Sequence, residues 1–256
     1  MKEMDYTILD KKLETFCSNK DVLGIVLVGS GSRQYRDELS DYDVEVIVKD
    51  HYYNQLDEEQ KFYEFEEEGI EILFYPEHDF SQKIKSCKDI EHWPYEECVI
   101  LHDTNQYLEE KIIEIAFITP EDREARLKLH YFEFLFSARR VKRTLTRGNE
   151  LNARLVSAQM VFVLVKLLFL LKYRWPPLLH WATENLELLE GIPEKIKLMM
   201  LEVIRRPDGF LAEKLITEVD NLLTSSGEHF HFVKTDITRQ ISGSNFRHIR
   251  EKYGLI

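Results

Sequence analysis

The sequence has 256 residues, of which 44% are hydrophobic and 31% charged, and this balance excludes a disordered or low-complexity chain. The net charge of −12 is uneven, because residues 1–112 carry 12 Lys and Arg against 28 Asp and Glu. Such an acidic half disfavours a nucleic-acid partner, since phosphate backbones bind to basic surfaces, and suits a small cationic substrate. The asymmetry predicts two domains, residues 1–112 and residues 118–256.

Targeting signals and cysteine spacing both favour a cytoplasmic protein. The first five residues are too charged for the apolar core of a signal peptide. Cys17, Cys87 and Cys98 lie far apart and show no metal-ligand spacing, which suits a reduced setting. Residues 155–171 are strongly apolar, but polar residues including Lys166 interrupt them. We therefore expect a central helix of a soluble bundle and no membrane span.

The first half of the chain alternates helical and strand patterns. Apolar residues recur at helical spacing over residues 8–17, which predicts an amphipathic helix. Short apolar runs rich in β-branched residues then predict four strands, over residues 24–28, 43–48, 70–75 and 98–102. Strands interleaved with helices predict an α/β (α+β) domain with a mixed sheet.

The second half of the chain is typical of a helical bundle. Thr119-Pro120 resembles a helix N-cap followed by proline at the first helical position. From there to about residue 221 long helical stretches alternate with breakers. These breakers are Gly148-Asn149, Trp175-Pro176-Pro177, Gly191-Ile192-Pro193 and Pro207-Asp208-Gly209. Residues after Ser225 give no clear pattern.

A glycine-rich loop follows the first predicted strand. Its sequence is Gly29-Ser30-Gly31-Ser32-Arg33, and we expect it to open a helix. Glycine lets a phosphate approach the backbone, and the free amides at a helix start favour anions. The loop lacks the lysine of a Walker loop and the third glycine of the dinucleotide fingerprint. An ordinary glycine turn is the alternative interpretation.

Acidic residues form the second and third parts of the pattern. Asp41 and Asp43 are two apart at the start of a valine-rich strand, so their side chains point to the same face. Neighbouring carboxylates repel one another unless they share a cation. Glu45 lies on the same face as a competing or supporting carboxylate. Glu71 is the one charged residue within an apolar strand; it would complete a metal triad on a central strand and face water on an edge strand.

Together these residues resemble the nucleotidyltransferase superfamily that includes DNA polymerase β and the aminoglycoside adenylyltransferases. The family pattern is Gly-Ser, then Asp-x-Asp, then a third acidic residue on a later strand. Gly29-Ser30, Asp41-Tyr42-Asp43 and Glu71 match it in order. The resemblance is specific over residues 21–50 and looser to 112. The helical half looks like the bundle of bacterial antibiotic adenylyltransferases, and many relatives have aspartate where Glu71 stands.

This resemblance implies a chemistry and roles for the matched residues. Asp41, Asp43 and Glu71 would bind two Mg²⁺ ions, and Glu71 would also take the proton of the acceptor hydroxyl. Gly29, Ser30 and the following amides would hold the phosphates of ATP or another nucleoside triphosphate. Arg33 would assist there, or be a surface residue of the following helix. The reaction would move a nucleoside monophosphate, AMP from ATP, to a hydroxyl of a small acceptor and release pyrophosphate.

The helical half offers further candidates. Lys166 would contact the triphosphate, or its amine would reach water from a helix edge. Glu133 would serve as a base for the acceptor. The basic run at residues 139–143 is either a solvated face or a partner of the acidic first domain.

Two other functions remain open from the sequence. One is a non-catalytic nucleotide-binding or antitoxin-type regulatory module, and the other is an enzyme that adenylylates a protein. The acceptor, the preferred nucleotide and the formation of a homodimer are also left open.

Overall fold

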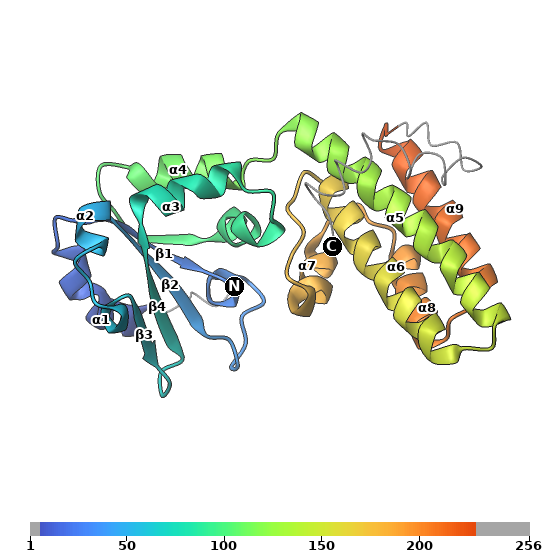
Figure 1. Cartoon of the computed structure of the whole chain (residues 1–256), viewed down its shortest axis with the longest axis horizontal. Coiled ribbons are helices and arrows are strands. Elements are labelled where there is room, and N and C mark those ends of the chain that lie inside the picture. Colours follow the sequence, from blue (N-terminus) through green and yellow to red (C-terminus); the bar gives the residue numbers. More distant parts are fainter. Residues whose placement is uncertain (1–5, 229–256) are drawn as a thin grey trace. The chain divides into compact units, whose positions relative to one another are not determined.

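The computed structural model describes residues 6–228, which divide between Phe117 and Ile118 into two compact units (Figure 1). The predicted first domain of residues 1–112 would end inside the helix Tyr107–Ala116, α4, which packs on the sheet of the first unit.

The first unit contains a mixed sheet, as the sequence pattern predicts, but it has five strands instead of the four predicted. The strands are β1 (Val22–Val28), β2 (Tyr42–Val48), β3 (Phe62–Phe65), β4 (Ile70–Pro76) and β5 (Val99–Asp103). Their order is β3-β4-β2-β1-β5, in which β2 and β4 are parallel and the other neighbours antiparallel. The short strand β3 was not predicted, because its four residues are bounded by charged runs rather than by turn formers.

Helices cover both faces of this sheet. One face packs against α1 (Thr7–Cys17), through Leu9 and Leu13. The other packs against α3 (Glu77–Gln82), α4 and the 3₁₀ segment η5 (Trp93–Glu97), through Phe80, Tyr95 and Leu108. The remaining short segments are α2 (Asp50–Tyr53) and the 3₁₀ turns η1 (Ser30–Ser32), η2 (Glu58–Gln60), η3 (Lys83–Lys85) and η4 (Asp89–Glu91).

Within its described residues, 118–228, the second unit is all-helical, as predicted. Its helices are α5 (Pro120–Thr146), α6 (Glu150–Leu171), α7 (Ala182–Leu188), α8 (Glu194–Arg205) and α9 (Gly209–Ser225), with the 3₁₀ turn η6 (Leu179–Trp181). The predicted N-cap of α5 is confirmed, since the Thr119 hydroxyl accepts from the Asp122 amide at 3.1 Å. Asn149 and Asp208 cap α6 and α9 in the same way, so two of the predicted breakers act as helix starts.

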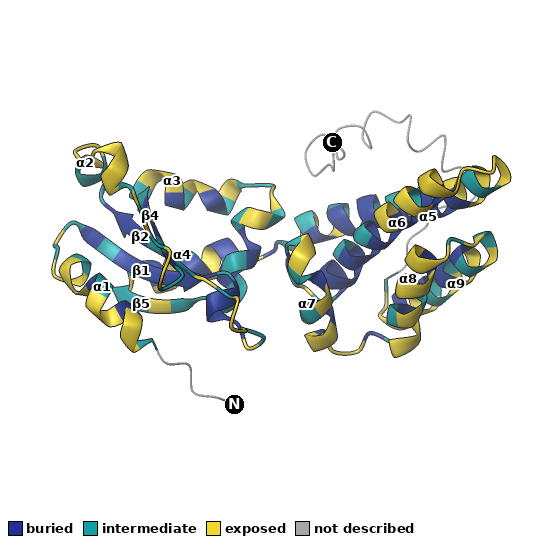
Figure 2. Cartoon of the chain, turned by 90° about the horizontal axis from the view of Figure 1, so that it is seen from below, coloured by how far each residue is buried: buried dark blue, intermediate teal, exposed yellow. Residues whose placement is uncertain are grey.

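Helix α6 is long and apolar enough to cross a membrane by length and composition. However, 61% of its most apolar 18-residue window is buried inside the structure. Figure 2 shows the buried side of α6 facing the other helices of its unit. This helix is therefore the core helix that the sequence predicts, with one side left open.

Candidate active site

The glycine-rich loop begins directly after β1. Gly29 has a φ of 67° and a ψ of −154°, a conformation that only glycine adopts readily. Ser30, Gly31 and Ser32 form the single 3₁₀ turn η1, and the Ser32 hydroxyl donates to the Gly29 carbonyl at 3.0 Å. The expectation that the loop opens a helix is wrong, because the chain turns extended at Arg33. The loop amides would therefore bind an anion without the help of a helix dipole.

Arg33 is buried under the loop and is not on the surface. Its side chain is 1% exposed, and its guanidinium donates to the Trp93 carbonyl at 2.7 Å. The same group lies 3.0 Å from the Glu97 carboxylate and 4.4 Å from the ring centre of Trp93. The alternative that Arg33 is a surface residue of a following helix is therefore wrong. Its contacts tie the loop to η5.

Arg36 is the arginine that borders the loop, and sequence reasoning passed over it. Its Nη1 donates to the Gly31 carbonyl at 3.4 Å, and its guanidinium stacks on the Tyr42 ring at 3.5 Å. The side chain is half-buried, so part of it reaches solvent. The sequence signal was its place between the loop and the Asp41-Tyr42-Asp43 run.

The sheet brings the predicted carboxylates to neighbouring backbone positions. Strand β4 lies between β3 and β2, so it is an inner strand, and Glu71 pairs in register with Asp43. Asp41 comes just before β2, beside Gly69, whose carbonyl accepts from the Tyr42 amide at 2.8 Å. Asp43 and Glu71 are half-buried and Asp41 is exposed. Glu71 therefore lies on an inner strand and not on an edge strand.

The electrostatics of Asp43 show that the three carboxylates are close enough to interact. Burial raises the pKa of Asp43, and the negative charges of Glu71 and Asp41 raise that pKa further. Within residues 6–228, however, no three Asp, Glu, His or Cys side chains are arranged as a set that could hold a metal ion. The strand register brings Asp43 and Glu71 to neighbouring positions, but their side chains do not form such a set as they stand.

Glu45 lies on the same face of the sheet as Asp43, as predicted, but its carboxylate bonds to Tyr95. The Tyr95 hydroxyl donates to the Glu45 carboxylate at 2.5 Å. Burial raises the pKa of Glu45, while the nearby Lys83 ammonium and the Tyr95 hydroxyl lower that pKa. Lys83 in turn pairs with Glu91 at 3.0 Å. Glu45 thus belongs to a polar network that ties β2 to the segments around η4 and η5, rather than to the carboxylates at Asp43.

Two glycines make room for the aspartates. A Cβ atom on Gly29 would stand 2.1 Å from Asp43 Oδ2, and one on Gly69 would stand 3.0 Å from Asp41 Oδ1. Both glycines also have positive φ. The loop and the acidic strand are therefore matched to each other in shape.

We expect Gly29→Ala to displace Asp43 and to lower both stability and activity. Backbone strain alone costs about 1–3 kcal/mol at such a conformation, and the contact with Asp43 adds to it. Gly148→Ala is the matched control, because Gly148 also has positive φ but a Cβ there would meet nothing within 4 Å. Thermal unfolding and turnover of both variants check this. Equal activity in the two variants would contradict the close fit at Gly29.

The predicted residues of the helical half lie in the second unit. Lys166 is half-buried on α6, with its amine 5.2 Å from the Phe162 ring centre. Glu133 is half-buried on α5, and its carboxylate lies 3.5 Å from His130 Nδ1. In the basic run at 139–143 the four cationic residues are exposed and Val141 is buried, so the run forms a solvated face.

Comparison with known proteins agrees with the fold of the first unit. Residues 9–113 match a family described as a nucleotidyltransferase domain, and residues 95–182 match a domain of unknown function, DUF4037. The first unit is thus a nucleotidyltransferase domain, the class of domain that the sequence resembles. It is accordingly a transferase.

One solved structure is similar to most of the chain. A nucleotidyltransferase-like protein from Exiguobacterium sibiricum 255-15 aligns over 95% of this chain and 86% of its own, at 16% identity and a TM-score of 0.49. No curated protein matches the sequence.

Proposed function

We propose that the enzyme transfers AMP from ATP to a hydroxyl of a small, cationic acceptor and releases pyrophosphate, with Mg²⁺ as cofactor. The observation that carries the proposal is the register of Asp43 and Glu71 on adjacent inner strands, with Asp41 beside them. The glycine-rich loop lies against the same residues, since a Cβ on Gly29 would touch Asp43. The loop amides that would bind phosphate and the carboxylates that would bind metal thus lie at one end of the sheet.

The donor set fits Mg²⁺. Carboxylate oxygens are the hard ligands that this ion prefers, and Asp41, Asp43 and Glu71 supply them. Burial raises the pKa of Asp43, and the negative charges of Glu71 and Asp41 raise that pKa further; a divalent cation would relieve this repulsion. When bound, two such ions would neutralise triphosphate charge and lower the pKa of the acceptor hydroxyl.

The chain's own residues have separate tasks in this proposal. The Ser30 hydroxyl and the loop amides bind the terminal phosphates. Arg36, rather than the buried Arg33, adds a cation on the open side of the loop. The acceptor oxygen attacks the α-phosphorus, its proton passes to the Glu71 carboxylate, and the bond to the bridging oxygen breaks as pyrophosphate leaves.

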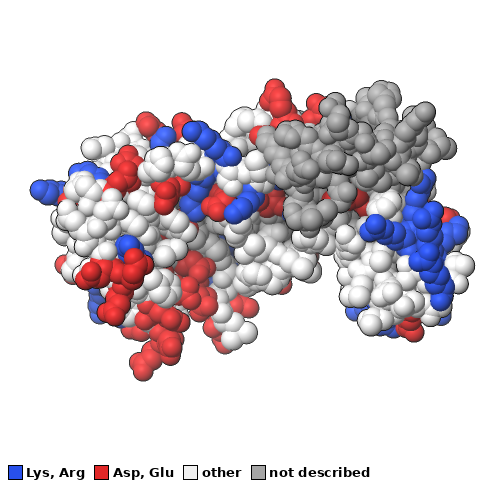
Figure 3. Space-filling model, viewed as in Figure 1, with Lys and Arg blue, Asp and Glu red and all other residues white. Residues whose placement is uncertain are grey.

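Charge supports a small cationic acceptor. The excess of Asp and Glu in residues 1–112 is large, and Figure 3 shows acidic side chains gathered on the visible face of the first unit. Acidic surroundings concentrate cations and repel polyanions such as nucleic acids. A phosphate contact by Lys166 and a cytoplasmic location remain parts of the proposal that rest on the sequence, and Glu133 is the alternative to Glu71 as the base.

Calorimetric titration of ATP, with and without Mg²⁺, tests the site. We expect binding that needs Mg²⁺ in the wild type and is lost in Asp41→Asn/Asp43→Asn. The control is Glu66→Gln/Glu67→Gln, which removes the same charge from two exposed residues at the turn between β3 and β4. Equal binding by the two double variants would show that nucleotide binds elsewhere. No binding of ATP, GTP, CTP or UTP by the wild type would refute the proposal.

A further inference from the structure

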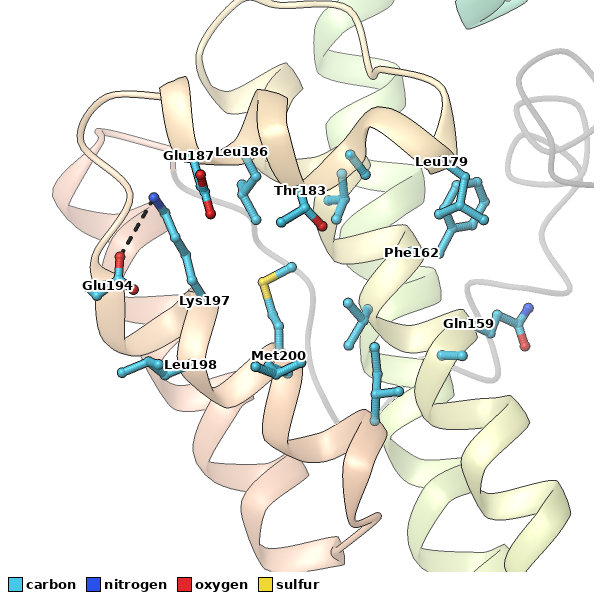
Figure 4. Close-up of a pocket in the computed structure, with 16 residues that line it drawn as sticks. Gln159, Phe162, Leu179, Thr183, Leu186, Glu187, Glu194, Lys197, Leu198 and Met200 are labelled. Atoms are coloured by element: carbon cyan, nitrogen blue, oxygen red, sulfur yellow. Dashed lines mark ion pairs between the residues drawn. The ribbon is translucent and has the colours of Figure 1, made fainter. Parts of the chain in front are cut away.

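The second unit has a large apolar groove that its own helices leave open. A cavity of about 950 Å³ lies between α6, α7 and α8 (Figure 4). Its walls are mainly apolar and include Val161, Phe162, Val165, Leu198, Leu201 and Ile204. We call the cavity and the apolar side chains along it the apolar groove.

Both long walls of the groove expose apolar side chains to solvent. On α8, Leu198, Leu201 and Ile204 follow one another at helical spacing and are 59%, 45% and 36% exposed. On α6, Leu151 and Leu155 continue the line of Phe162 and are 67% and 60% exposed. Soluble proteins rarely leave a contiguous apolar face of this kind uncovered, so we infer that it is an interaction surface.

The two ends of the groove carry opposite charge. At one end the cavity is lined by Glu187, Glu194 and Lys197, a net charge of −1, and Lys197 lies 3.7 Å from Glu194. Figure 4 shows these three residues together at one side of the cavity, with Gln159 and Leu179 at the other.

The opposite end is basic. Arg154 and Arg206 line a smaller hollow together with Glu150, so the charged residues there sum to +1. The start of α6 thus lies beside the end of α8. The groove therefore begins at the acidic first turn of α8 and follows the apolar side chains in the middle of that helix. It ends near Arg206, after the last turn of α8, and Arg154 at the start of α6.

We propose that this groove binds a second copy of the same chain in a two-fold symmetric dimer. A two-fold axis through the middle of the groove sets the apolar centre of one copy on that of the other. It also brings the acidic end of each copy to the basic end of its partner, and such self-complementarity is what a symmetric interface requires. A small apolar ligand would account for the cavity but not for the opposite charges at its two ends.

Light scattering of the full chain tests the dimer. We expect a mass twice the 30.5 kDa of one chain. Leu201→Asp places a charge in the centre of the groove and should weaken the dimer at least about tenfold, as losses at central interface residues do. Phe210→Asp is the control, because Phe210 is 76% exposed in the same unit but does not line the groove. Thermal unfolding verifies that both variants fold.

Charge reversal tests the symmetry itself. Glu194→Arg alone and Arg206→Glu alone should each give monomers, since like charges then meet at both ends. Mixing the two variants should restore dimers that contain one copy of each, because both ends are again complementary. A monomeric wild type, equal effects of Leu201→Asp and Phe210→Asp, or no recovery on mixing would overturn the proposal.

Discussion

Asp43→Asn is expected to lower nucleotidyl transfer by about 10³-fold or more while raising the thermal stability of the metal-free protein. Losing several kcal/mol of charge stabilisation at the reacting phosphate corresponds to about that loss of rate. The stability gain has a separate cause. Burial and the neighbouring Glu71 and Asp41 raise the pKa of Asp43 above its ordinary 3.8, so the folded state disfavours the ionised carboxylate.

The gain in stability expected for Asp43→Asn depends on pH. Between the ordinary pKa of 3.8 and the raised pKa of folded Asp43, the folded protein binds more protons than the unfolded chain. Stability contributed by Asp43 therefore falls as the pH rises through this window, and the loss is complete at neutral pH. The advantage of Asp43→Asn should thus be larger at pH 7 than at pH 4, in thermal unfolding with a chelator present. Glu67→Gln is the exposed control, and a variant less stable than wild type at pH 7 would contradict the repulsion argument.

Arg33 and Arg36 should separate into a structural and a functional arginine. Arg33→Met leaves the Trp93 carbonyl and the Glu97 carboxylate without their cation, and breaking a buried pair costs about 3 kcal/mol. Because Glu97 is partly exposed, solvent will recover some of that loss. Arg36→Met should leave the unfolding temperature unchanged and raise the KM for ATP by about tenfold, the effect of one lost charge-assisted contact.

Measurements on these two variants together show which arginine contacts ATP and which one stabilises the fold. Denaturant unfolding measures the first effect, and initial rates against ATP concentration measure the second. A normal KM in Arg36→Met, together with a raised KM in a folded Arg33→Met, would return the phosphate role to Arg33.

The sequence predicted most of the first unit because its signals are local. Short β-branched runs identified four strands, and the spacing of Asp41 and Asp43 identified the acidic face. Two features depend on contacts between residues far apart in the sequence, and the sequence pattern left them undecided. The position of β4 as an inner strand, which decides the role of Glu71, depends on β3 covering its outer edge. The burial of Arg33 depends on Trp93, which lies 60 residues away.

The predicted helix after the loop was wrong for a physical reason. A strand followed by glycines often leads into a helix, but here the chain must cross to β2 and returns through an extended Arg33. In the second unit, turn residues and caps marked the helix boundaries well. The apolar groove was invisible in the sequence, because exposed leucines on α6 and α8 have the same spacing as core leucines.

The pairing of Asp43 with Glu71 also bears on how the protein folds. Along β4 buried Ile70, Ile72 and Phe74 alternate with Glu71, so a slip of one residue against β2 would turn the glutamate into the core and the isoleucines outward. A chain with this shifted register would thus lose both the buried apolar contacts of β4 and the placement of Glu71 beside Asp43. Molecules in which β2 and β4 are not paired in this register should therefore be inactive.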